Sequence, residues 1–152
     1  MSTRIQKLAV ASSAGAVLRG REQLKRAFDQ LDQAQTADNS ASKFLNAHLA
    51  ALHAASAVAA ISDVPARMRT KSVWLQLPRA SAELAPWAEV FAASARLRPL
   101  ADMERTDRIS WDRADELLEL ADTFVSEVVR NHPQLLEIGH LAGSPAPRAL
   151  AG

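Results

Sequence analysis

The sequence has no cysteine, and only 5% of its residues are aromatic. Without cysteine the chain cannot form a disulfide, a thiolate metal site or a thiol nucleophile, so those classes of scaffold and catalyst are excluded. An excess of one charge is missing as well, because 18 basic residues face 17 acidic ones and the net charge is +1. A balanced chain has no global field that attracts nucleic acid or an anionic membrane, so such binding requires a local patch.

The motifs of common catalysts are also missing. The chain has no Gly-rich phosphate loop, no Rossmann fingerprint, no Gly-x-Ser-x-Gly elbow and no zinc signature with two histidines and an intervening glutamate. No apolar run approaches the roughly 18 to 20 residues of a membrane span. Near the N-terminus two basic residues, Arg4 and Lys7, precede a weakly apolar stretch that serines interrupt, which is a poor export signal. We therefore expect a cytoplasmic location, no membrane association and no cofactor.

The stretch from Lys43 to Ile61, KFLNAHLAALHAASAVAAI, contains no Gly or Pro and is mostly alanine. Alanine is the best helix former, and the spacing of the larger apolar residues matches one face of a helix. The predicted face consists of Phe44, His48, Ala51, Leu52, Ala55, Val58 and Ala59. Further apolar residues widen this face, so the segment is predicted to be the central, most buried helix.

Helical periodicity continues through most of the chain, and no segment alternates with period two for long enough to predict a strand. The predicted helices span residues 2–34, 43–61, 73–77, 79–97 and 110–131. Ser72 and Ser110 are expected to cap the helices that follow them, and Pro78 is expected to stop the short one. The helix of residues 79–97 either begins near Pro86 or kinks there, and residues 98–109 are expected to form a charged linker.

A chain of 152 residues is long enough for one domain with a sizeable core. We predict an all-α fold, a bundle of four main helices plus one or two short ones, formed by residues 1–142. Residues 143–152, GSPAPRALAG, are predicted to be a disordered tail.

His48 lies on the apolar face of the central helix, where a core histidine that bonds to a neighbouring helix is the favoured interpretation. The alternative is a catalytic histidine helped by Lys43 or Asn46. His53 lies about 140° further round the helix, so the two histidines cannot share a metal. The carboxylates of the last helix have a spacing that could hold a metal, but the Glu-x-x-His pairs of di-iron bundles are absent. No metal site is predicted.

The one local excess of positive charge is Arg67, Arg69 and Lys71, with Arg79 shortly after and Trp74 between. Such a basic loop beside an indole can bind an RNA backbone and stack a base. In the competing interpretation Trp74 fills the core and the basic residues keep a turn solvated. The other two tryptophans, Trp87 and Trp111, are expected in the core.

Two stretches, FLNAHLAALHAASAVAA and SVWLQLPRASAELAPWAEVFAASA, resemble a small actinobacterial family of the HEPN superfamily (higher eukaryotes and prokaryotes nucleotide-binding). The resemblance covers roughly residues 24–129 and implies a bundle of four to five helices that is commonly dimeric. Many members of the superfamily are metal-independent ribonucleases with an arginine, four to six intervening residues and a histidine at a dimer cleft. Here His132 follows Arg130 too soon and His140 too late, and Lys43 to His48 is the nearest imitation.

The resulting functional prediction is a non-catalytic HEPN-like module, expected to form a homodimer and to bind RNA, a nucleotide or a protein partner. The alternative is a metal-independent ribonuclease with a divergent site around His48, in which, as the resemblance implies, the histidine would act as general base or as a phosphate-oriented acid.

Overall fold

The computed structural model describes residues 2–136, with side chains described from Ser13 onward. The helices are α1 (Ser2–Gln35), α2 (Ser40–Ile61), α3 (Val73–Ala80), α4 (Trp87–Ala95), α5 (Arg98–Asp102) and α6 (Trp111–Asn131), with two short 3-10 helices, η1 (Ala66–Met68) and η2 (Pro133–Leu135). No strand occurs within residues 2–136, so the all-α prediction is confirmed. The predicted tail, residues 143–152, lies outside the described residues.

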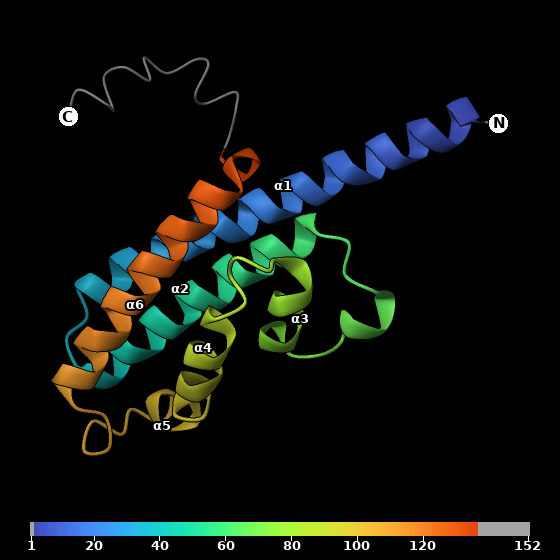
Figure 1. The fold of residues 1–152 in the computed structure, drawn as a ribbon. Coiled ribbons are helices and arrows are strands. Elements are labelled where there is room, and N and C mark those ends of the chain that lie inside the picture. Colours follow the sequence, from blue (N-terminus) through green and yellow to red (C-terminus); the bar gives the residue numbers. More distant parts are fainter. Residues whose placement is uncertain (1, 137–152) are drawn as a thin grey trace, which may run out of the picture.

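The bundle is built around α2, which packs against every other α-helix of the described chain. Figure 1 shows α1, α2 and α6 side by side, with α3, α4 and α5 covering another side of α2. The N-terminal part of α1 extends past the end of α2. This arrangement confirms that the alanine-rich segment is the central helix.

Helix α2 is buried on more than one face. Its fully buried alanines include Ala47, Ala50 and Ala54, which lie outside the predicted face, whereas Leu52, expected on that face, is half-buried. Small side chains around the helix let neighbours approach from several directions, so one stripe does not describe its burial. By length and composition α2 could cross a membrane, a property that the sequence analysis missed, but half of its most apolar window is buried in the bundle. Core helices of soluble proteins share this character.

The helix starts follow from short polar side chains. Asn39 caps α2, because its side-chain oxygen accepts a hydrogen bond of 2.8 Å from the Ser42 amide. Ser72 caps α3 and Ser110 caps α6 in the same way, as predicted, and Asp112 lies in the first turn of α6. A carboxylate there interacts favourably with the helix dipole.

The prolines act differently from one another. Pro78 does not stop α3, which continues to Ala80, so that prediction is wrong. Pro86 is the N-cap residue of α4, which confirms that this helix begins at the proline and does not bend there. Pro99 lies in the first turn of α5, where its missing N–H costs nothing. A short helix therefore forms where a linker was expected.

The core contains an aromatic cluster from α3, α4 and α6. Its members are Trp74, Trp87, Phe91 and Phe124, with neighbouring ring centroids 5.1–6.4 Å apart. Two other aromatic residues are exposed, and one of them, Trp111, was expected in the core. Phe28 of α1 is 42% exposed and Trp111, at the start of α6, is 48% exposed.

Gly20 is a point of close approach between α1 and the rest of the bundle. A Cβ atom there would lie 2.7 Å from Leu135 Cδ2, 3.1 Å from Ile61 Cγ2 and 3.2 Å from the Ala57 carbonyl oxygen. The absence of a side chain is therefore a packing requirement, although glycine lowers intrinsic helix stability.

We expect Gly20→Val to lower the free energy of unfolding by about 1–3 kcal/mol, the usual cost of overpacking. Gly15→Val is the matched control, because a Cβ at Gly15 meets only Arg19 Nη1, at 3.4 Å. Its effect should stay within about 0.5 kcal/mol, as at surface sites. Urea unfolding followed by circular dichroism measures both, and equal stabilities of the two variants would contradict the close approach.

Candidate functional site

His48 lies inside the bundle and is 1% exposed. Its Nδ1 lies 2.7 Å from the Ser94 Oγ of α4, and the Ser94 hydroxyl in turn donates to the Phe91 carbonyl oxygen at 3.0 Å. Because the hydroxyl proton is used in that bond, Nδ1 carries the imidazole proton and donates it to Ser94 Oγ. The ring also lies against Trp74, with centroids 6.1 Å apart. The contacts are those of a core histidine bonded to a neighbouring helix.

The charge state of His48 follows from this burial. Desolvation, helped by the positive charge of Arg98 and opposed by Asp102, lowers the pKa of His48 from 6.5 to about 4. The imidazole is therefore neutral near pH 7, and it is a weak base that solvent does not reach. General base catalysis works best with a pKa near the operating pH and with access to the reacting proton.

Lys43 and Asn46 do not converge on His48. The Lys43 ammonium forms an ion pair with Asp115 of α6 and lies 5.8 Å from the centre of the Trp111 ring. The Asn46 side-chain amide donates to the Ser42 carbonyl oxygen, one turn earlier on α2, at 2.9 Å. His48, Lys43 and Asn46 thus each bind a different partner instead of meeting at one site.

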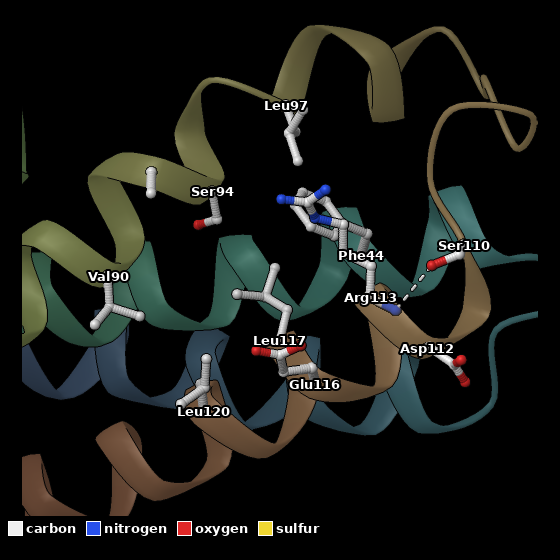
Figure 2. Close-up of a pocket in the computed structure, with 11 residues that line it drawn as sticks. Phe44, Val90, Ser94, Leu97, Ser110, Asp112, Arg113, Glu116, Leu117 and Leu120 are labelled. Atoms are coloured by element: carbon white, nitrogen blue, oxygen red, sulfur yellow. Dashed lines mark hydrogen bonds between the residues drawn. The ribbon is translucent and has the colours of Figure 1, made fainter.

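A pocket of about 500 Å³ lies between α4 and α6, with Phe44 of α2 at its inner wall (Figure 2). Most of its lining is apolar, and Arg113 and Glu116 of α6 bring charges to it. Ser94 also lines this pocket and holds the His48 ring, which is not itself among the lining residues that the structure describes. The Ser110–Arg113 hydrogen bond drawn in Figure 2 is the N-cap of α6 and belongs to the helix.

The basic loop after α2 borders a second, larger groove of about 860 Å³. Arg69 and Lys71 line it together with Arg19 of α1, which the sequence analysis did not single out, and among the lining residues that the structure describes Asp63 is the one carboxylate. Hydroxyl and amide side chains complete its polar lining: Ser13, Ser56, Ser62 and Gln76. We call this site the basic groove.

Backbone contacts hold the loop that carries these cations. Arg69 Nε donates to the Val64 carbonyl oxygen at 3.2 Å, and Gln76 Nε2 donates to the Lys71 carbonyl oxygen at 2.8 Å. The Gln76 side chain is buried in α3, so it fixes the loop against the bundle. The positions of Arg69 and Lys71 at the groove are therefore set by the fold.

The remaining predicted nucleic-acid residues lie elsewhere. Arg67 on η1 and Arg79 on α3 are exposed and do not line the basic groove. Trp74 is 6% exposed and stacks on Phe91, with ring centroids 5.2 Å apart. It offers no ring face to a base, and the structure places it in the core. Within the described residues no group of three His, Asp or Glu side chains could hold a metal ion.

Comparison with known proteins finds one protein family. The family model for SAV_6107-like HEPN proteins matches residues 34–129. The match begins at the end of α1 and covers helices α2 to α5 and most of α6. No curated protein and no solved structure matches the chain.

Proposed function

The chain belongs to the SAV_6107-like HEPN family, and we propose that it is a non-catalytic module that self-associates and binds RNA or a nucleotide in the basic groove. A phosphate-bearing ligand is preferred to the third predicted class, a protein partner, because of the charges at the groove. Its location is predicted to be cytoplasmic.

The observation that carries the proposal is the meeting of Arg19, Arg69 and Lys71 at one groove whose described lining contains a single carboxylate, Asp63. Three cations against one anion leave an excess of positive charge where the chain as a whole has almost none. Guanidinium groups bind phosphate oxygens through two hydrogen bonds at once, and ammonium groups bind them as point charges. A groove of about 860 Å³ is in the size range of small-molecule sites.

The non-catalytic part of the proposal is supported by the surroundings of His48. Its ring is buried, its Nδ1 proton is used by Ser94, and burial lowers its pKa to about 4. Lys43, the nearest imitation of the ribonuclease arginine, forms an ion pair with Asp115 instead of lying beside the histidine. The arrangement favours a structural role for this histidine.

The groove is tested by measuring the binding of a fluorescently labelled single-stranded oligouridylate at several salt concentrations. For single strands, each phosphate contact contributes about 0.7 to the slope of log K against log salt. We therefore expect the double variant Arg19→Gln/Lys71→Gln to bind more weakly and to lose about 1.4 of that slope. Arg69 is left unchanged because it also holds the loop through Val64.

The matched control is Arg67→Gln/Arg79→Gln, which removes the same charge from exposed positions outside the groove. It should bind like the wild type. Equal losses in both double variants would indicate diffuse attraction, and a wild-type chain without affinity for the oligonucleotide or for ATP would contradict the proposal.

The same samples test the ribonuclease alternative. If the wild type cleaves the oligonucleotide without added metal and His48→Asn does not, the protein is an enzyme with a site around His48. Sedimentation velocity of the same wild-type samples tests self-association, for which we expect a species of twice the chain mass.

A further inference from the structure

A separate apolar groove of about 630 Å³ lies between α1 and the chain that follows α6. Leu18, Leu24 and Phe28 line it from α1, and Leu135 and Leu136 line it from η2 and the residue after it. Although such side chains are usually covered, Leu18 is 59% exposed and Phe28 is 42% exposed. Among the residues that the structure describes, the charged ones at this groove are Arg21, Glu22 and Lys25. We call this surface the α1 groove.

The chain leaves the described region at this groove. Leu136, the last described residue, itself lines the α1 groove. The preceding turn is fixed there, because Arg21 Nε donates to the Gln134 carbonyl oxygen at 3.0 Å and Leu135 packs at Gly20. Residues 137–142 read Glu-Ile-Gly-His-Leu-Ala, with two large apolar side chains, Ile138 and Leu141.

The length of this segment is sufficient to reach the exposed residues. Gly20 and Phe28 are eight residues apart on a helix, or about 12 Å along its axis. Five residues of extended chain, from Leu136 to Leu141, span about 16 Å. A tether this short keeps the segment at an effective concentration of about millimolar or higher at the groove.

Charge favours this occupant over a second copy of the chain. Arg21 and Lys25 outnumber Glu22 at the groove, so a second copy pairing through the same surface would bring like charges together. The segment instead begins with Glu137, whose carboxylate is opposite in charge to both basic residues. The segment therefore offers apolar side chains that can cover the groove and a carboxylate that can pair with its basic residues.

We propose that residues 137–142 fold back onto α1 and cover Leu18 and Phe28, with Ile138 and Leu141 occupying the α1 groove. This contact is independent of RNA or nucleotide binding, since the α1 groove and the basic groove share no lining residue. It closes an apolar surface of α1 with the protein's own chain.

Hydrogen exchange of the full-length chain tests this contact. The amides of residues 137–142 should exchange at least tenfold more slowly in the wild type than in Leu18→Asp/Phe28→Asp. Leu75→Asp is the matched control, because Leu75 of α3 is also 59% exposed but lies outside the groove. It should leave the protection unchanged. Since all three side chains are exposed, the variants should keep the helical circular dichroism signal.

A second measurement uses substitutions within residues 137–142. Hydroxyl-radical footprinting should label Phe28 more strongly in Ile138→Ser/Leu141→Ser than in the wild type. Fast exchange of residues 137–142 in every protein would overturn the proposal. So would a Leu18→Asp/Phe28→Asp variant that dissociates a dimer without changing the exchange of the segment, because the groove would then be an interface between copies. Neither readout depends on a bound ligand, so failure of the RNA proposal leaves this test intact.

Discussion

Phe124→Ala is expected to lower the free energy of unfolding by about 3–5 kcal/mol, as for buried aromatic residues elsewhere. Phe124 of α6 is fully buried, and its ring lies 5.1 Å from Phe91, 5.6 Å from Trp87 and 6.4 Å from Trp74, between centroids. The substitution removes a side chain by which α6 contacts α3 and α4. Because packed aromatic pairs contribute beyond their buried area, the loss should lie in the upper part of the range for core truncations.

Phe28→Ala is the matched control, since it deletes the same atoms from a side chain that is 42% exposed. Its cost should be less than half that of Phe124→Ala. Guanidinium unfolding followed by circular dichroism gives both values, and the slope against denaturant shows whether unfolding stays two-state. Equal costs at the two positions would contradict the aromatic cluster as the centre of the core.

The helices were predictable because their signals are local. The Asn, Ser and Pro residues that begin α2, α3, α4 and α6 act within one turn, and α2 was identified by its alanine content and the spacing of its larger apolar residues. Residues 98–109 were predicted to form a linker because many of them are charged. That prediction overlooked the buried residue that attaches the segment to the core. Ile109 is fully buried, and its carbonyl oxygen accepts a hydrogen bond of 2.6 Å from Ser40 Oγ across the bundle. Only the tertiary arrangement reveals that contact.

The candidate sites were likewise predictable only where the signal is local in the sequence. The excess of charge at Arg69 and Lys71 is visible in the sequence, but Arg19 joins them only because α1 passes the end of α2. The placement of two tryptophans has a similar cause. Trp74 enters the core from a short helix, whereas Trp111 lies in the first turn of α6 beside Lys43 and is 48% exposed. Helical periodicity locates a residue on its own helix and does not show what covers it.

The stability of the protein is expected to fall by about 3 kcal/mol as the pH decreases from 6.5 to about 4, through His48 alone. Burial and the charge of Arg98 lower the pKa of His48 in the folded state from 6.5 to about 4. Between these values the unfolded chain binds a proton that the folded chain does not, so stability is fully present above pH 6.5 and is lost as the pH falls. The rate of loss is about 1.4 kcal/mol per pH unit.

His48→Asn isolates this contribution, because asparagine retains an N–H near the Nδ1 position that can donate to Ser94 but does not titrate. The variant should be less stable than the wild type at pH 7. As the pH falls toward 4, the free energy of unfolding of the wild type should decrease by about 3 kcal/mol relative to that of the variant. Burial also lowers the pKa values of His53 and His132, and their contributions remain in both proteins and cancel. Urea unfolding at intervals of half a pH unit measures this difference in stability. Two parallel stability curves would mean that the pKa of His48 is the same in the folded and unfolded protein, as for an imidazole open to water. A histidine of that kind is the general base that the ribonuclease alternative requires.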